Sequence, residues 1–363
     1  MWLIIIVLLL AAVVAGFCYL VTRLPRFGIF SRFGFSAKKE KLISFVIVLV
    51  LFCISALFCG IWNSAVIFIH LILIWLICDL AGLLLKKAGA SSPKQYIAGY
   101  AAILLTAAYL CAGYVTAHRV VRTSYTLTTA KALPSETFRI AGFSDSHVGT
   151  LFTADGLSEY VSRINAENPD IVVIVGDFVD DSTTRDQMEK ACSALSELTP
   201  KYGTYYVFGN HDSGYYSGSR GYGREELIAS LEENGVSVLE DETVTVADSV
   251  AVVGRLDKQY KTRTPADDLI ASDEKYTVVL DHQPNDYDAE AASGADLVLS
   301  GHTHGGQLIP INRVGELIGA NDRTYGHEKR DNTDFIVSSG IGDWELWFKT
   351  GCVSEYFVVD ISH

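Results

Sequence analysis

The chain has 363 residues, enough for one domain of ordinary size and a second structural unit. Its charge divides it in two. Residues 1–116 carry nine Lys and Arg and two acids, a balance of +7, whereas residues 117–363 carry 20 Lys and Arg and 40 Asp and Glu, a balance of −20. The acidic second part argues against binding to nucleic acid or anionic lipid through net charge. The sequence leaves the oligomeric state open.

The first part contains four apolar stretches, at about residues 2–21, 42–61, 65–85 and 96–115. Each has about 20 residues, the length that an α-helix needs to cross the hydrocarbon core of a bilayer. A cleaved signal peptide would need a basic segment before the first stretch, and none is present. We therefore predict four membrane-spanning helices within residues 1–116.

The basic residues indicate how these helices are oriented. Six follow the first stretch and three precede the fourth, and they are Arg23, Arg26, Arg32, Lys38, Lys39, Lys41, Lys86, Lys87 and Lys94. The short turn expected at residues 62–64 has none. Because Lys and Arg concentrate in cytoplasmic loops, we predict a multi-pass cell-membrane protein whose later domain lies outside the cytoplasm.

From about Tyr125 the sequence alternates between apolar runs typical of strands and helical periodicity. The runs that predict strands are 138–143, 171–175, 203–208, 243–246, 250–254, 276–280, 297–299, 335–337 and 356–359. Helices are predicted at 157–166, 187–198 and 225–233. This order predicts a layered α/β domain at residues 137–363, with a mixed sheet or two packed sheets, after a connector at 117–136.

Polar clusters follow directly on five of these apolar runs. They occupy residues 144–147, 176–180, 209–212, 281–282 and 301–304. Ligands of open α/β sheets collect beyond the carboxyl ends of the strands, so we expect the five clusters to converge.

The side chains in these clusters are typical metal ligands. The candidates are Asp145, His147, Asp177, Asn210, His211, His282, His302 and His304. Imidazole and carboxylate suit Mn²⁺, Fe²⁺ or Zn²⁺. There are too many ligands for one tetrahedral ion, and the number fits two ions that share a carboxylate. Each cluster alone also fits a helix cap, a turn or a core histidine, but together they predict a binuclear metal site.

The last cluster, GHTHGGQ, has a spacing of its own. His302 and His304 are two residues apart, so an extended backbone would place both on one face. Glycines in and around the clusters would permit sharp turns at positive φ and close approach of the backbone.

The ordered blocks DSH, GDFVD, GNHD, DH and GHTH resemble the signature of the calcineurin-like metallophosphoesterase superfamily over residues 138–307. Residues 305–307 and 337–342 resemble its YkuE-like or YaeI-like membrane-associated branch. The resemblance implies a four-layer α/β/β/α sandwich.

The resemblance also implies a role for each candidate residue. One metal ion would be bound by Asp145, His147 and His304, and the other by Asn210, His282 and His302, with Asp177 bridging the two. It implies His211 as the general acid, Asp212 as the group that orients His211, and Asp180 as a support for the ligands. A metal-bridging hydroxide would be the nucleophile.

Two segments are candidates for selecting the substrate. The loop at residues 213–224 offers Tyr215, Arg220 and Arg224, because arginine suits phosphate oxygens and tyrosine can stack on a base or a sugar. The alternative is a flexible surface loop. The aromatic segment 343–348 would either dip into the lipid headgroup layer or pack in a small satellite core.

The sequence therefore predicts a membrane-anchored, two-metal phosphoesterase. Its expected substrate is a phosphodiester or pyrophosphate, either soluble or lipid-linked, with a phosphodiesterase favoured over a monoesterase and Mn²⁺ over Fe²⁺ or Zn²⁺. One alternative is a catalytically silent metal-binding receptor or scaffold, against which the presence of His211 argues. Another is a phosphatase module that regulates a four-helix transporter.

Overall fold

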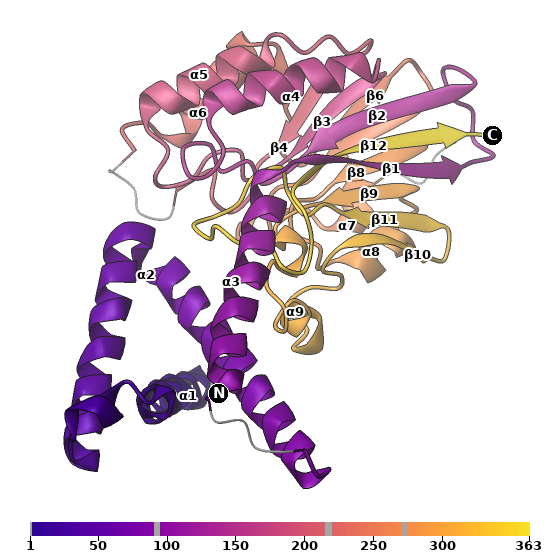
Figure 1. The fold of residues 1–363 in the computed structure, drawn as a ribbon. Helices are drawn as coiled ribbons and strands as arrows, with labels where there is room; N and C mark the ends of the chain where they lie inside the picture. Colours follow the sequence, from indigo (N-terminus) through magenta and orange to yellow (C-terminus); the bar gives the residue numbers. More distant parts are fainter. Residues whose placement is uncertain (1, 91–94, 215–219, 271–273) are drawn as a thin grey trace. The chain divides into compact units, whose positions relative to one another are not determined.

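The computed structural model describes residues 2–90, 95–214, 220–270 and 274–363 (Figure 1). The chain folds into two compact units, Met1–Gly113 and Tyr114–His363. The first unit is helical, and its elements are α1 (Trp2–Arg23), η1 (Leu24–Phe27), η2 (Phe30–Phe33), α2 (Ala37–Lys87) and α3 (Ile97–His118), whose last turn lies in the second unit.

Helix α2 is broken at Gly60. This residue has φ 77° and ψ 164°, which are not helical angles, so α2 consists of one arm at residues 37–59 and another at 61–87. The predicted stretches 42–61 and 65–85 fall on these two arms, but the turn expected at 62–64 was wrong, because those residues are helical. The chain breaks instead at glycine, whose missing Cβ permits a positive φ. Among the helices whose side chains the structure describes, α2 and α3 are long and apolar enough to cross a membrane.

The second unit contains two mixed β-sheets. In spatial order the first sheet consists of β1 (Val121–Thr128), β12 (Glu355–Ser362), β2 (Thr137–Phe143), β3 (Ile171–Val175), β4 (Thr204–Val207) and β5 (Val236–Val238). The second consists of β10 (Gly326–Arg330), β11 (Thr333–Val337), β9 (Leu297–Ser300), β8 (Tyr276–Leu280), β7 (Val250–Gly254) and β6 (Glu242–Val246). Strands β2 to β5 run parallel, as do β7, β8, β9 and β11, while antiparallel pairs lie toward the edges.

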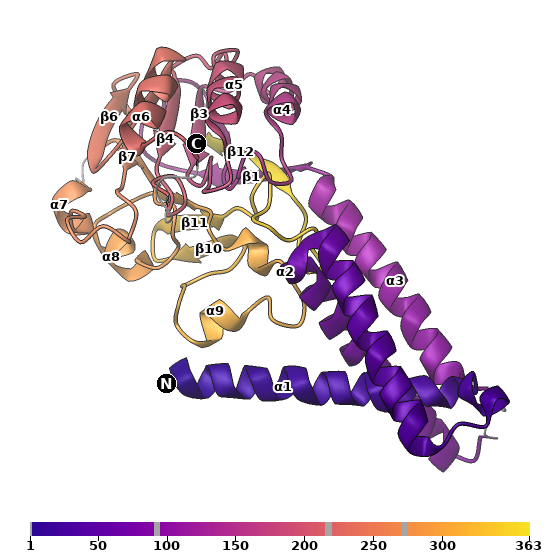
Figure 2. The ribbon, with the colours of Figure 1, turned by 90° about the vertical axis from the view of Figure 1, so that its left-hand side faces the viewer.

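Helices cover the outer faces of both sheets (Figure 2). They are α4 (Ala154–Ala166), α5 (Arg185–Leu195), α6 (Arg224–Glu233), α7 (Ala266–Leu269) and α8 (Tyr287–Ala292), and shorter turns are η3 (His304–Gly306) and α9 (Val314–Leu317). One buried cluster joins α4–α6 to the first sheet, a second lies between the sheets, and a third joins the second sheet to α7 and α8. The unit is therefore layered as helices, sheet, sheet and helices.

Local sequence explains how these elements begin and end. Thr153 caps α4 by accepting a hydrogen bond from the Gly156 N–H, and Thr184 with Gln187 forms a capping box at α5. All five residues of β3 are buried, as expected for a continuous apolar run in the middle of a parallel sheet. Aligned pairing of β2, β3 and β4 brings the ends of these strands to one edge.

Three strands, β1, β5 and β10, were not predicted, and all three lie at sheet edges. The connector expected at residues 117–136 contains β1, which pairs in parallel with β12, so that prediction was wrong for residues 121–128. Strand β10 (GHEKR) is largely charged and pairs on one side with β11. Edge strands bury few side chains and often carry charge, so they give no apolar run by which to find them.

Candidate metal centre

The five polar clusters lie at the ends of adjacent strands. Three follow β2, β3 and β4 of the first sheet, and two follow β8 and β9 of the second. Backbone hydrogen bonds join neighbouring clusters: the Asp145 N–H donates to the Gly176 carbonyl over 2.9 Å, and the Gly301 N–H donates to the His282 carbonyl over 2.9 Å. Convergence at one edge is what the strand-end pattern predicted.

Two groups of potential ligands form there. Asp145, His147 and His304 make up one group, and Asp177, His282 and His302 make up the other. Within each group the ligand atoms lie within 4.8 Å of one another. Each group is therefore compact enough to hold one ion.

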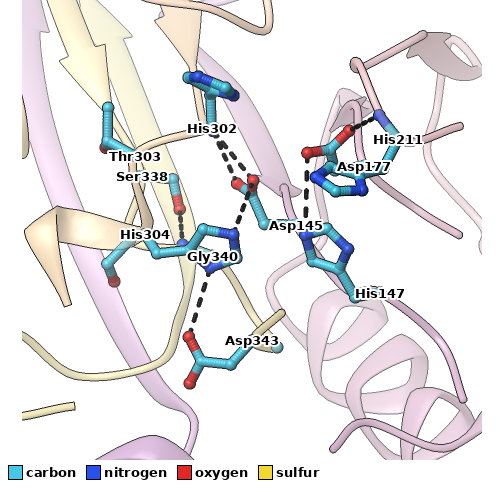
Figure 3. A network of polar contacts seen from close by, with 12 residues as sticks. Asp145, His147, Asp177, His211, His302, Thr303, His304, Ser338, Gly340 and Asp343 are labelled. Carbon is cyan, nitrogen blue, oxygen red and sulfur yellow. Dashed lines mark hydrogen bonds and ion pairs between the residues drawn. The ribbon is translucent and has the colours of Figure 1, made fainter. Parts of the chain in front are cut away.

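Asp177 faces both groups. Its Oδ2 lies 3.1 Å from Nε2 of His282. The same oxygen lies 3.8 Å from Nε2 of His147 (Figure 3). Its other oxygen, Oδ1, accepts the backbone N–H of His211 over 2.8 Å. One carboxylate oxygen is thus directed between the two groups while the other anchors a neighbouring loop.

Second contacts fix how three of the imidazoles point. Nδ1 of His282 lies 2.8 Å from the Val175 carbonyl, which can only accept, so this nitrogen donates. Nδ1 of His147 faces the Asp180 carboxylate at 3.6 Å, in the supporting position expected for Asp180. Nδ1 of His304 faces Oδ1 of Asp343 at 3.3 Å. Each ring therefore presents Nε2 to the centre, the arrangement usual for metal-binding histidines.

The donor atoms fit divalent cations. Among the described side chains, Nε2 of His147, Nε2 of His282 and Oδ1 of Asn210 are buried without a hydrogen-bond partner. Burial lowers the pKa of His302 and of His304 to about 3, so both rings are neutral and able to act as ligands. Nitrogen and carboxylate donors with no thiolate suit Mn²⁺, Fe²⁺ or Zn²⁺.

The charges also fit a cationic occupant. Burial disfavours a charged ring at His282, yet Asp177 and Asp145 raise its pKa well above the ordinary value. For His147, burial again opposes the charged form, but Asp180, Asp177 and Asp145 raise its pKa. The carboxylates thus stabilise positive charge at this centre, and a bound metal ion can replace the protons.

Five of the potential ligands adopt a rare backbone conformation. Positive φ angles occur at Asp145 (52°), His147 (41°), Asp177 (51°), His302 (68°) and His304 (49°). Such angles are uncommon outside glycine and cluster at functional sites. The extended backbone expected at residues 302–304 was wrong: the chain turns left-handed at both histidines, and their rings join different ligand groups.

Gly209 leaves room for Asp177. A Cβ at residue 209 would lie 2.5 Å from the backbone nitrogen of Asp177 and closer still to its Oδ1. We therefore expect Gly209→Ala to displace the Asp177 carboxylate, and to lower the manganese content of the purified protein by at least one ion per chain. Gly221→Ala is the control, because a Cβ at residue 221 would meet open space. Gly221 has a positive φ, so any strain in the control comes from the backbone alone. An unchanged manganese content in Gly209→Ala would show that a Cβ at residue 209 does not displace the Asp177 carboxylate.

Asp212 does not have the contacts expected of a group that orients His211. Its Oδ2 accepts the backbone N–H groups of Asp177 (2.8 Å) and Gly209 (2.7 Å), and its Oδ1 accepts that of Val179 (3.0 Å). The prediction was wrong because the aspartate turns inward to the loops after β3 and β4. Asp212 fixes the backbone that carries Asp177.

His211 lies beside the first ligand group. Its ring centroid is 5.0 Å from that of His147 and 5.6 Å from that of Trp344. Burial lowers the pKa of His211. The ring is close to the potential ligands but belongs to neither three-residue group.

The residues predicted to bind substrate are less well placed. Tyr215 lies outside the described residues. Arg220 is buried, stacks over Tyr222 and donates to the Asp212 carbonyl over 2.7 Å. Arg224 forms an ion pair with Glu240 and stacks over Phe208. Both arginines have structural partners, so the prediction of a phosphate-binding role is not supported for either.

The sequence did not predict Asp343 and Lys349. Both are buried, and Nζ of Lys349 lies 3.1 Å from Oδ1 of Asp343 and donates to the Ser339 carbonyl over 2.7 Å. Asp343 also contacts His304, so the pair extends the ligand network away from the centre (Figure 3). Asp343 was considered only as part of an aromatic segment, and a single acid far along the chain gives no signal of this contact.

Known proteins are similar to the part of the chain that contains this centre. The calcineurin-like phosphoesterase family matches residues 138–306. A metallophosphoesterase of Aquifex aeolicus is 33% identical over 227 residues, which cover 60% of this chain and 82% of that protein. Metallophosphoesterase YkuE of Bacillus subtilis is 27% identical over 267 residues, which cover 69% and 91%. A transmembrane protein with metallophosphoesterase domain of Danio rerio is 30% identical over 234 residues, which cover 60% and 51%.

The chain spans little more than half the length of several other curated relatives, 55% in one case and 59% in another. The matched family region contains all five polar clusters and both ligand groups. A sheet edge that gathers two sets of potential metal ligands in this order, together with these relatives, places the chain in the calcineurin-like metallophosphoesterase family, in its YkuE-like branch.

Proposed function

We propose that the chain hydrolyses phosphodiesters with two divalent metal ions, Mn²⁺ being favoured. The observation that carries the proposal is the position of Asp177, with one oxygen facing histidines of both ligand groups. When bound, two such ions hold the attacking and leaving oxygens of a phosphoryl centre and acidify water. Asp145, His147 and His304 would hold one ion, and the second would be held by His282, His302 and Asn210, with Asp177 shared.

The remaining side chains would position these ligands and move a proton. His211 would donate a proton to the leaving oxygen; burial lowers its pKa, so the protonated ring is a stronger acid but is populated at lower pH. Asp180 and Asp343 would orient His147 and His304, respectively, through their Nδ1 atoms. Asp212 would fix the loop that carries Asp177.

The test is hydrolysis of bis-p-nitrophenyl phosphate by the full chain in detergent, after metal removal and again after addition of Mn²⁺. We expect turnover only with Mn²⁺, and a loss of roughly 10²- to 10⁴-fold in His211→Ala, the usual contribution of a general acid. Two bound Mn²⁺ per chain without turnover of this diester or of p-nitrophenyl phosphate would instead support a silent metal-binding receptor.

Asp343 provides a prediction about metal affinity. Asp343→Asn keeps an acceptor toward His304 but removes the negative charge behind the ring. We expect the affinity for Mn²⁺ to fall by about 10- to 100-fold, the usual effect of losing such a supporting carboxylate. Titration of the metal-free protein by calorimetry measures this, with the exposed Asp186→Asn as control. Equal affinities in the two variants would show that Asp343 does not support the ligand.

We further propose that residues 1–116 form four membrane-spanning helices. Support comes from the apolar helices α2 and α3, from the break at Gly60 that divides α2 into two arms of membrane-spanning length, and from the Danio rerio relative described as a transmembrane protein. The Asp79 carboxylate within α2 is paired with Arg23 at 2.6 Å and accepts from Tyr19 and Tyr96, as charged groups in membranes require.

The expected topology places the phosphoesterase unit outside the cytoplasm. This follows from the Lys- and Arg-rich segments after α1 and at the end of α2. A C-terminal tag that is accessible to an impermeant reagent in intact cells would support it, and a tag that is accessible only after permeabilisation would refute it.

A further inference from the structure

The phosphoesterase unit exposes large apolar side chains in one small region. Among the described residues beyond His118, those that are strongly exposed are Ile309, Ile311, Val314, Leu317, Ile318 and Trp344, with 42–82% of each residue accessible. Five of the six lie within residues 309–318, which we call the apolar loop. Patches of this kind on a water-soluble surface mark sites of contact with membranes or proteins.

The apolar loop is held rigidly at its base. The Gln307 carbonyl accepts the backbone N–H groups of Thr350 (2.8 Å) and Gly351 (3.1 Å), and the Ile309 N–H donates to Oγ1 of Thr350 over 3.0 Å. Its one acid, Glu316, accepts the Thr324 N–H over 2.7 Å and is therefore engaged within the protein. The exposed side chains thus project from a fixed support, and Figures 1 and 2 show α9 standing away from the sheets.

The same support joins the apolar loop to the metal centre. The loop begins three residues after η3, which contains the ligand His304. Gln307 donates from Nε2 to Oδ1 of Asp343 over 3.2 Å, and the ring of Trp344 lies 5.6 Å from that of His211. Whatever contacts Trp344 therefore lies close to His211, and the apolar loop follows His304 closely in the chain.

Residues 349–354, which hold the base of the apolar loop, are also hydrogen-bonded to the end of α3. The Ser354 N–H donates to the Thr116 carbonyl over 3.2 Å, Oγ of Ser354 donates to the Ala117 carbonyl over 2.8 Å, and Thr116 donates to the Lys349 carbonyl. Helix α3 ends at His118 and β1 begins at Val121, a distance of at most about 11 Å along the chain. If α3 crosses a bilayer, residues 343–354 lie where it leaves the membrane.

We propose that the apolar loop and Trp344 insert into the lipid surface and present headgroup phosphodiesters to the metal centre. The occupant is the bilayer because the apolar loop and Trp344 together supply aliphatic side chains, one tryptophan and one exposed cation, Arg313, the composition of interfacial segments. The contact depends on burial of apolar side chains rather than on net charge, and the proposed membrane anchor holds the unit at the lipid surface despite its acidic balance. The proposal rests on the membrane anchoring and phosphoesterase activity proposed above.

The reaction implied is hydrolysis of a lipid phosphodiester. Water adds across one P–O bond, the phosphorus keeps the new oxygen as a phosphomonoester, and the leaving oxygen takes a proton to become an alcohol. Phosphatidylglycerol is a suitable probe of this class. It differs from bis-p-nitrophenyl phosphate in being available only at the lipid surface.

Insertion is tested without reference to activity. Full-length Leu317→Trp and Thr245→Trp are reconstituted in vesicles of equal parts phosphatidylcholine and phosphatidylglycerol, with and without brominated acyl chains that quench tryptophan on contact. Thr245 is an exposed residue of the edge strand β6. We expect the fluorescence added by Leu317→Trp to be quenched and that added by Thr245→Trp to persist. Unquenched fluorescence in both variants would overturn the proposal. It would mean that the loop contacts something other than lipid, either the chain's own helices or a second copy.

Activity provides the second test, with Leu317→Glu and its control Thr245→Glu in the same vesicles. We expect Leu317→Glu to hydrolyse phosphatidylglycerol at least about tenfold more slowly than the control, because burial of one leucine contributes a factor of that order or more. Hydrolysis of bis-p-nitrophenyl phosphate should be equal in the two. Equal rates on both substrates, or hydrolysis of the soluble diester alone by the unmodified chain, would overturn the proposal. No hydrolysis of either substrate would overturn the proposed function instead, and the quenching result would still decide insertion.

Discussion

Asp177→Asn is expected to abolish hydrolysis of bis-p-nitrophenyl phosphate, with a loss of at least about 100-fold. Asp177 is anionic in the folded chain because, although burial opposes the charge, the neighbouring His282 and His147 hold the pKa of Asp177 well below its usual range. The amide is neutral and has nearly the same shape. The asparagine would direct an NH₂ group, or a more weakly binding neutral oxygen, toward the Nε2 atoms of His147 and His282. These atoms lie 3.8 Å and 3.1 Å, respectively, from Oδ2 of Asp177.

The same substitution should preserve the fold. Oδ1 of Asp177 accepts the His211 N–H, and an asparagine oxygen can continue to do so. The expected change is therefore in metal content, from two Mn²⁺ per chain to one or none, with little change in the thermal unfolding of the metal-free protein. Elemental analysis and calorimetric titration measure this, with Asp186→Asn as the exposed control. Two tightly bound ions and normal turnover in Asp177→Asn would exclude the shared-carboxylate centre.

Much of the centre could be predicted from the sequence because its ligands follow apolar runs. Asp145, Asp177, His282 and His302 each come directly or almost directly after a buried strand, and strand ends of one sheet meet at one edge. The sequence pattern alone did not assign ligands to two separate ions. That assignment came from the family resemblance, and the two groups in the structure are arranged in agreement with it.

The parts that could not be predicted depend on contacts between distant residues. Asp343 reaches His304 across 39 positions of the chain through a loop without regular structure, and no local pattern indicates this contact. Asp212 was assigned from its place beside His211, but the left-handed turn at Asp177 brings backbone N–H groups to its carboxylate instead. Arg220 and Arg224 have a composition suited to phosphate, yet aromatic rings and Glu240 bind them within the fold.

Secondary structure shows the same division. Central strands such as β3 were found from continuous apolar runs, since both of their faces are buried. Strand β1 has side chains that are mostly exposed or half-buried and owes its place to pairing with β12, which lies more than 200 residues later in the chain. Such pairing between distant segments forms only in the assembled sheet, so the sequence of residues 121–128 alone does not indicate a strand.

The largest effect on stability is expected from Arg255→Met. The Arg255 guanidinium is almost fully buried, and its Nη1 lies 3.1 Å from Asp281 and 2.9 Å from Glu290, while Nη2 lies 2.8 Å from Asp286. Removing the cation leaves the buried Glu290 without its cationic partner, whereas Asp281 keeps its ion pair with Arg263. Loss of one partner of a buried ion pair costs about 3–5 kcal/mol of the free energy of unfolding. Because Asp281 directly precedes His282, the end of β8 should loosen as well. Arg163→Met, which removes an exposed pair with Glu159, should cost less than about 1 kcal/mol.

The destabilisation caused by Arg255→Met should depend on pH in one direction. Burial and the neighbouring Asp281 already raise the pKa of Glu290 well above its ordinary value, while Arg255 opposes that rise. Without Arg255 the folded-state pKa rises further, so above the unfolded-state pKa the folded variant binds more protons and loses stability as pH increases. Thermal unfolding of the full chain in detergent should therefore show a smaller difference from the unmodified protein near about pH 5 than near about pH 8. A difference that is constant, or larger at the lower pH, would mean that the lost stability comes from packing of the arginine side chain rather than from its charge.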